Sequence, residues 1–171
     1  MRPVLPVLIL ALALIGLADS TYLSLAHFGI VDLHSSYLPS VCRIGAGGCN
    51  EALNSQQGTV FGIPTALLGA GYFAALLAAA LVRNVYGKWH RPLALAALLT
   101  GGAAFSAYLL HSLFFVVNAL CPYCVAAHAI NLAAIVLGVV SFGRDGLTAS
   151  AGRYLQEFAR GHAPRRWRTQ P

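Results

Sequence analysis

The most constraining feature of this sequence is a stretch of 52 residues, 92–143, that contains no Lys, Arg, Asp or Glu. About 20 consecutive apolar residues cross the hydrocarbon core of a bilayer as a helix. The stretch is therefore more than twice as long as one membrane span and shorter than three. It predicts two membrane helices joined by a tight turn.

The composition also indicates a membrane protein. Only 9% of the 171 residues are charged and 58% are hydrophobic, with a mean hydropathy of +0.70, whereas a soluble domain carries about 25% charged residues. The net charge of +6 does not indicate nucleic-acid binding. The basic residues flank the apolar runs and form no patch with interleaved aromatic residues.

Two further apolar runs, residues 3–28 and 60–82, bring the predicted membrane helices to four. Pro64 is expected in the first turn of the second helix, where its missing N–H is tolerated. Within 92–143 we expect the turn near Asn118 and helices over 92–117 and 121–142, because Pro122 favours a helix start. Arg2 before a leucine-rich run also resembles a signal peptide, but the run is longer than a typical signal core.

The predicted fold class is an all-α membrane protein, a four-transmembrane-helix bundle with a long loop, residues 29–60, between helices 1 and 2. Ten of the eleven Lys and Arg residues lie in the N-terminus, the 83–91 connector or the tail. The positive-inside rule therefore places both termini in the cytoplasm and the loop outside. We expect a membrane domain over residues 1–145 and a basic cytoplasmic tail over residues 146–171, disordered at its end, and a short surface helix at 50–55.

All four cysteines fall on the extracytoplasmic side of this topology. Cys42 and Cys49 lie in the loop with six residues between them, three of them glycine, whereas Cys121 and Cys124 form a CxxC motif at the start of the fourth helix. A helix N-terminus lowers the pKa of a thiol. We expect Cys121 nearer the surface and Cys124 deeper in the bundle. The arrangement favours disulfide exchange from the loop pair to the membrane pair, and then to a lipid-soluble acceptor.

Other interpretations of the cysteines stay open. They could form two static disulfides, bind zinc through four thiolates, or serve as inert small apolar residues. The apolar flanks and the oxidising compartment argue against zinc. A non-enzymatic membrane scaffold or transporter subunit would be consistent with any of the three.

Three of the ionisable residues within the predicted spans are candidates for a function. Asp19 and His111 fall in the outward halves of the first and third helices, and His128 follows Cys124 by one helical turn. Ionisable groups are costly inside a membrane and often mark functional sites. Each is a candidate for contact with the electron acceptor, and structural hydrogen bonding is the alternative for Asp19 and His111. Asn118 and Asn131 are expected to be packing residues.

The order of these motifs resembles the vitamin K epoxide reductase family, in particular its bacterial members that make protein disulfides. The resemblance covers about residues 5–142. It rests on the four helices, the loop cysteine pair, Asn54-Ser55, the Phe61-Gly62-Ile63-Pro64 segment, and Cys121-Pro122-Tyr123-Cys124 at the start of the last helix.

This resemblance implies a quinone-dependent thiol-disulfide oxidoreductase of the bacterial cytoplasmic membrane. Cys42 would exchange with a separate thioredoxin-like protein, Cys49 would carry the disulfide to Cys121, and Cys124 would face the quinone. Ser55 would supply a hydroxyl beside the quinone-reducing cysteines. The cofactor would be ubiquinone or menaquinone, with no metal.

The chain departs from the family pattern at two positions. His128 stands where the animal enzymes have a tyrosine that helps bind vitamin K, and Gly58 stands where the family has an asparagine. Both differences favour plain quinone reduction and leave epoxide reduction as the alternative. Many bacterial relatives also carry a fused thioredoxin domain, and here the partner is expected to be a separate protein.

Overall fold

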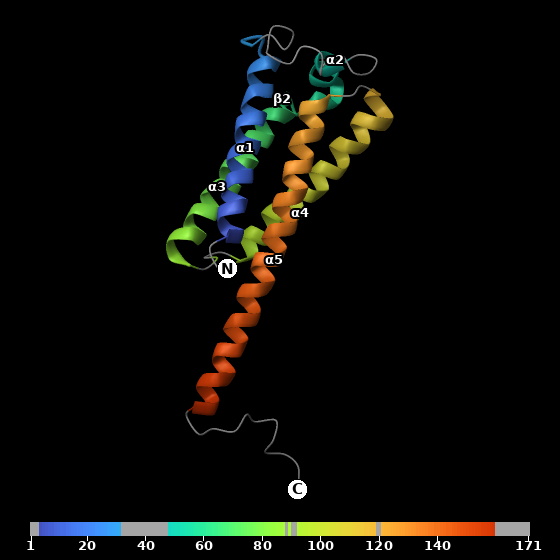
Figure 1. Ribbon diagram of the computed structural model, residues 1–171. Coiled ribbons are helices and arrows are strands. Elements are labelled where there is room, and N and C mark those ends of the chain that lie inside the picture. Colours follow the sequence, from blue (N-terminus) through green and yellow to red (C-terminus); the bar gives the residue numbers. More distant parts are fainter. Residues whose placement is uncertain (1–3, 32–47, 88, 90–91, 119–120, 160–171) are drawn as a thin grey trace.

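The computed structural model describes residues 4–31, 48–87, 89, 92–118 and 121–159, with the backbone alone at 50, 92 and 145–159. Four of its helices are long and apolar enough to cross a membrane. They are α1 (Val4–His27), α3 (Thr65–Tyr86), α4 (Pro92–His111) with the π-helix η3 (Ser112–Val117) that continues it, and α5 (Pro122–Ala159). The predicted four-helix membrane bundle is confirmed (Figure 1).

Close contact between α1 and α3 depends on small residues. A Cβ on Gly16 of α1 would collide with the ring of Phe73 on α3, and Phe73 is itself almost fully buried. One turn further along α1, Ser20 lies opposite Gly69, where an added Cβ would be 3.2 Å from the serine hydroxyl. Glycine lets helix backbones approach closely in lipid, where packing replaces the hydrophobic effect as the main attraction between helices.

The loop end of the bundle is covered by a short helix, α2 (Gly48–Asn54), which confirms the helix predicted near this position. His27 Nδ1 lies 3.1 Å from the carbonyl oxygen of Leu53, so the end of α1 is bonded to the end of α2. Below α2 is an apolar cluster whose buried members come from α1, α2, η3 and the residue before α5: Leu23, Cys49, Ala52, Leu53, Leu113 and Cys121.

The second membrane helix begins later than predicted. A single 3-10 turn, η2 (Gln56–Gly58), leads into a hairpin of β1 (Thr59–Val60) and β2 (Ile63–Pro64), so α3 starts at Thr65. Phe61 and Gly62 form the turn with φ angles of 51° and 77°. Positive φ at both turn residues is the geometry of a tight hairpin, which apolar composition alone does not reveal. Pro64 therefore precedes the helix and is not in its first turn.

The remaining boundaries agree better with the prediction near the site than in the tail. Asn118 has a φ of 52° and terminates η3, which confirms the turn expected there. Helix α5 continues to Ala159, so the part of the tail at 146–159 extends the last span as a helix and is not disordered (Figure 1). No proline interrupts the sequence between Pro122 and Pro164. The expected disorder at 160–171 lies outside the described residues.

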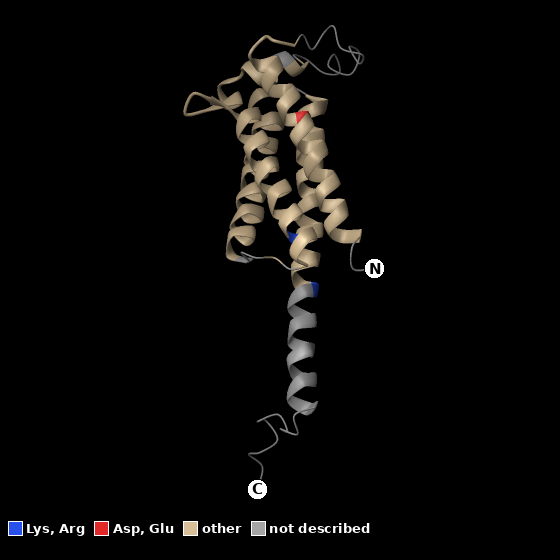
Figure 2. Ribbon diagram, turned by 90° about the vertical axis from the view of Figure 1, so that its left-hand side faces the viewer, with Lys and Arg blue, Asp and Glu red and all other residues tan. Residues whose placement is uncertain are grey.

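The two ends of the bundle differ in character. Arg83 near the end of α3 and Arg144 in α5 lie toward the end where the chain begins, and Figure 2 shows the basic residues there. The α2 helix, the hairpin and the start of α5 lie at the opposite end (Figure 1). Both described cysteine-bearing segments are therefore at the end of the bundle away from the basic residues.

Candidate active site

The start of α5 holds two free thiols in direct contact. Cys121 immediately precedes Pro122, the first residue of the helix. Its sulfur lies 2.6 Å from the sulfur of Cys124 and accepts a hydrogen bond of 3.3 Å from the Cys124 backbone N–H. Cys121 thus caps the helix with its side chain. Closing a disulfide here requires only a small approach, since an S–S bond is about 2.05 Å long.

The environment of Cys121 favours its thiolate. The hydrogen bond donated by the Cys124 thiol lowers the pKa of Cys121, and backbone N–H groups at the helix start act in the same direction, against the effect of burial. A thiolate is the nucleophile in thiol-disulfide exchange. Of the two thiols, Cys121 is therefore the one prepared to react with another sulfur.

The two cysteines differ in what they face. Cys121 has no exposed surface and belongs to the buried cluster under α2, which also contains Cys49 at 2% exposure. Cys124 is only partly buried and lines a cavity between the helices. The expectation that Cys121 lies nearer the surface is wrong, because α2 folds over the start of α5. Cys124 is correctly placed toward the bundle interior.

The loop pair is described only in part. Cys49 lies in the first turn of α2 and is disulfide-bonded. The prediction for Cys42 falls outside the described residues. The structure therefore holds the membrane pair as dithiol and Cys49 as disulfide, with Cys49 and Cys121 in one apolar cluster.

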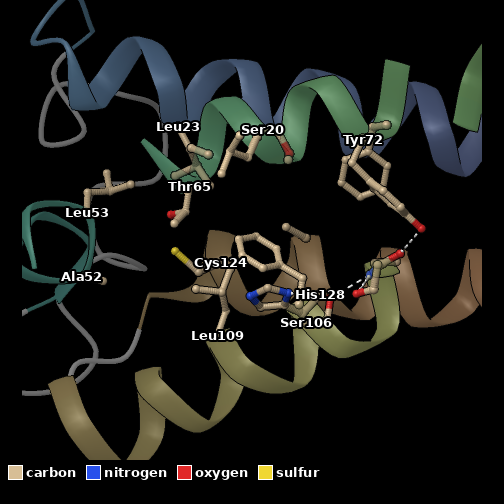
Figure 3. Close-up of a pocket in the computed structure, with 18 of the residues that line it drawn as sticks. Ser20, Leu23, Ala52, Leu53, Thr65, Tyr72, Ser106, Leu109, Cys124 and His128 are labelled. Carbon is tan, nitrogen blue, oxygen red and sulfur yellow. Dashed lines mark hydrogen bonds between the residues drawn. The ribbon is translucent and has the colours of Figure 1, made fainter. Parts of the chain in front are cut away.

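The cavity beside Cys124 has a volume of about 300 Å³ and is predominantly apolar. Its walls come from α1, α2, α3, α4 and α5, and Figure 3 shows the side chains that line it. Residues that contribute to it include Ser20, Leu23, Leu53, Thr65, Gly69, Tyr72, Phe105, Ser106, Leu109, Cys124, Ala127, His128 and Asn131. An apolar cavity with a few polar groups at defined positions is typical of a site for a small organic molecule.

Four polar side chains of the cavity, those of Tyr72, Asn131, Ser106 and His128, form one hydrogen-bonded chain. The Tyr72 hydroxyl donates to Asn131 Oδ1 at 2.7 Å, and Asn131 Nδ2 donates to Ser106 Oγ at 2.7 Å and to the Gly102 carbonyl at 3.0 Å. Ser106 Oγ in turn lies 3.0 Å from Nδ1 of His128. The chain connects three helices, α3, α4 and α5, and ends at a ring one turn below Cys124.

Ser55 lies beside a smaller cavity of about 60 Å³ that adjoins the first, and both cavities reach Cys124 and His128. Its hydroxyl donates to the Ala52 carbonyl at 2.8 Å and accepts from the Gly58 N–H at 3.1 Å. Gly58 leaves no room for a side chain, because a Cβ there would collide with the Leu53 carbonyl.

Two of the predicted acceptor-contacting residues lie away from the two cavities. Neither Asp19 nor His111 lines either cavity. Asp19 has a buried carboxylate oxygen without a partner among the described residues. His111 is exposed, and its ring packs against the ring of Phe115 with the two centroids 5.1 Å apart. Asn131, expected to be a packing residue, is central to the hydrogen-bonded chain. Its position three residues after His128, on the same helix face, was the available signal.

The fold and this site define a multi-pass membrane protein with a dithiol at the wall of an apolar cavity. Among the described residues, no three His, Cys, Asp or Glu side chains are grouped so that they could hold a metal ion. The family model described as the vitamin K epoxide reductase family matches residues 7–139. The chain belongs to this family, whose members are membrane oxidoreductases of the thiol-disulfide and quinone-linked kind.

Proposed function

We propose that this protein oxidises the dithiol of a separate thioredoxin-like protein and passes the electrons to a membrane quinone, ubiquinone or menaquinone. The activity would support disulfide formation in exported proteins. The observation that carries the proposal is the placement of Cys124, hydrogen-bonded to a buried Cys121 on one side and lining an apolar cavity on the other.

The reaction at the cavity balances without a metal. The Cys121–Cys124 dithiol loses two electrons and two protons as its S–S bond forms, and the quinone gains both to become a hydroquinone. The partner's dithiol then reduces the new disulfide through Cys42 and Cys49. Each exchange proceeds by thiolate attack on a disulfide sulfur.

Two features support a relay between the pairs. Cys49 and Cys121 lie in the same buried cluster, so little movement separates the loop pair from the membrane pair. When Cys49 attacks the Cys121 sulfur of the Cys121–Cys124 disulfide, Cys124 is the leaving group. In the reverse step, the lowered pKa of Cys121 favours its attack as a thiolate on the disulfide that contains Cys49. Apolar surroundings also protect the mixed disulfide from other thiols.

The polar wall of the cavity has the groups that a quinone requires. His128 presents its ring to the cavity one turn from Cys124, and Ser55 lies at the adjoining smaller cavity. We assign His128 to a quinone carbonyl and Ser55 to the region beside the reacting sulfur. The apolar remainder of the wall would contact the quinone ring and the first part of its tail.

Ten of the eleven basic residues of the sequence favour a cytoplasmic location for the end of the bundle that includes the N-terminus. The cysteines at the opposite end would then face the oxidising, extracytoplasmic compartment. We include this orientation in the proposal, because the cysteines must be accessible to exported proteins.

The test is quinone reduction by purified full-length protein in lipid, with ubiquinone-1 as acceptor. A reduced thioredoxin-like protein and the small dithiol dithiothreitol are compared as donors. Cys124→Ala and Cys121→Ala should each reduce turnover to background with either donor. Cys42→Ala should lose turnover with the protein donor and keep it with dithiothreitol. Full turnover with both donors in all these variants would contradict the proposal.

Reduction of the vitamin K epoxide is the second activity to test, with the epoxide offered in place of the quinone. The sequence resemblance gives this activity less support. The family asparagine cannot be accommodated at Gly58 without moving the Leu53 carbonyl. Detectable epoxide reduction that depends on Cys124 would establish it nevertheless.

A further inference from the structure

The hydrogen-bonded chain below Cys124 has a fixed direction, which one backbone group determines. The carbonyl of Gly102 can only accept a hydrogen bond, so the atom of Asn131 that lies 3.0 Å from it must be the amide nitrogen. The amide oxygen of Asn131 therefore faces Tyr72, whose hydroxyl donates to it. The reverse orientation would place two carbonyl oxygens against each other.

The orientation of the Asn131 amide also determines the direction of the hydrogen bond between Ser106 and His128. The amide nitrogen of Asn131 has a second hydrogen, which it donates to Ser106 Oγ at 2.7 Å. Ser106 is 3% exposed, so its own O–H must be satisfied inside the protein. Among the described residues the remaining group near Ser106 Oγ is Nδ1 of His128, at 3.0 Å. The serine hydroxyl therefore donates to Nδ1, and Nδ1 is the acceptor nitrogen of the ring.

In a neutral imidazole one ring nitrogen carries the proton and the other accepts. We propose that the Gly102 carbonyl, Asn131 and Ser106 hold His128 in the tautomer with its proton on Nε2, and so make it a hydrogen-bond donor toward the cavity. Asn131 and Ser106 are positioning residues, since they act through His128. In Figure 3 the ring of His128 has one nitrogen toward Ser106 and the other on the side of Cys124.

This assignment rests on the proposed function where it concerns the quinone. A quinone carbonyl offers only acceptor atoms, and its oxygen gains negative charge as the dithiol is oxidised. A ring with its proton on Nε2 can donate a hydrogen bond both to the quinone carbonyl and to the negatively charged oxygen formed during reduction. A ring with its proton on Nδ1 would present a lone pair to the carbonyl and repel it. The direction of the chain is thus a determinant of quinone specificity that lies entirely outside the cysteines.

The packing of α3 against α4 permits this chain. Gly102 lies against the ring of Tyr72, and a Cβ at this position would be 2.6 Å from its atoms. The absence of a side chain at Gly102 therefore lets Tyr72 reach Asn131. Unsatisfied polar groups are costly at membrane depth, so the complete chain also holds the three helices in register.

The experiment is solid-state ¹⁵N NMR of the full-length protein, labelled at histidine and reconstituted in lipid without quinone. His128→Gln identifies the signals of His128. Protonated and unprotonated ring nitrogens give separate signals, and we expect the proton on Nε2. In Asn131→Asp the carboxylate accepts from Ser106, whose oxygen then accepts from the ring, so the proton should move to Nδ1. An unchanged tautomer in folded Asn131→Asp would overturn the proposal.

A second variant decides the matter if Asn131→Asp does not fold. Ser106→Ala removes the donor to Nδ1 and should shift the signal of that unprotonated nitrogen, whereas Ser141→Ala, a buried serine further along α5, should not. Equal spectra for both alanine variants and the wild type would overturn the proposal.

Kinetics provide the second readout. With dithiothreitol and ubiquinone-1, Ser106→Ala should raise KM for the quinone about two- to tenfold, the value of one hydrogen bond, with a smaller change in kcat. Ser141→Ala should retain the wild-type KM. Absence of quinone turnover in the wild type would contradict the proposed function and leave the tautomer result standing by itself.

Discussion

Cys124 lies 2.6 Å from Cys121, sulfur to sulfur, yet only Cys124 reaches the cavity. Cys121 is fully buried on the other side, in the cluster that contains Cys49. The helix start at Pro122 produces this division, because it places the two sulfurs in contact while directing them to different neighbours. Cys121 is therefore placed for exchange with Cys49, whereas Cys124 is placed for reaction with an acceptor in the cavity.

The cavity can be tested as the quinone site by filling it. Ala127 of α5 lines the cavity, whereas its neighbour Ala126 is exposed on the outer surface of the helix. Ala127→Leu should raise KM for ubiquinone-1 by about tenfold or more, since added methylenes in a filled site cost about 1–3 kcal/mol. Steady-state quinone reduction with dithiothreitol measures the effect.

Ala126→Leu is the matched control, with the same change one residue away, and should leave KM within about twofold of the wild type. If the two variants behaved alike, the quinone would bind elsewhere.

The pKa of Cys121 should depend on Cys124. The hydrogen bond from the Cys124 thiol lowers the pKa of Cys121, so the thiolate persists at pH values where an ordinary thiol is protonated. Cys124→Ala removes this donor and should move the titration of Cys121 to higher pH. Ultraviolet absorbance of the thiolate, followed across pH in the protein with a reduced membrane pair, reports the shift.

Cys121→Ala controls for the other thiols, because it should abolish the low-pH part of that titration. A titration of Cys121 that is the same with and without Cys124 would show that the hydrogen bond has no influence on the thiolate.

Loss of Cys49 should trap the partner. In Cys49→Ala the mixed disulfide between Cys42 and a thioredoxin-like protein cannot be resolved from within the loop, so a covalent adduct should accumulate in cells. Non-reducing electrophoresis and mass spectrometry of the adduct identify the partner. The Cys42→Ala, Cys49→Ala double variant should form no adduct, and an adduct in that variant would place the exchange at another cysteine.

Contact between α1 and α3 should be sensitive to a single methyl group. Gly16→Ala drives a Cβ into the ring of Phe73 and should destabilise the protein by about 1–3 kcal/mol. Thermal unfolding in detergent, followed by circular dichroism, measures the loss.

Phe73→Leu in the same chain should recover part of that stability by removing the ring. Gly71→Ala is the control on α3, because a Cβ there meets nothing within 4 Å, and it should leave the protein as stable as the wild type or more so. Equal losses for Gly16→Ala and Gly71→Ala would indicate a general effect of glycine replacement.

Much of the fold follows from the sequence because hydropathy acts over whole helices. A charge-free stretch at 92–143 leaves little alternative to two spans, and the left-handed conformation of Asn118 and the helix start at Pro122 depend on residues close in the chain. The hairpin at Phe61-Gly62 was missed, since its apolar residues look the same to a hydropathy argument whether they form a turn or a helix.

Local sequence likewise determined the pairing of Cys121 with Cys124, because a spacing of three residues at a helix start brings two side chains together. Tertiary structure alone decided which neighbour each sulfur meets. Burial of Cys121 depends on α2, and the route from the Gly102 carbonyl to His128 passes back and forth across the interface between α4 and α5. These contacts join residues 22 to 72 positions apart, where no periodicity in the chain carries information about distance.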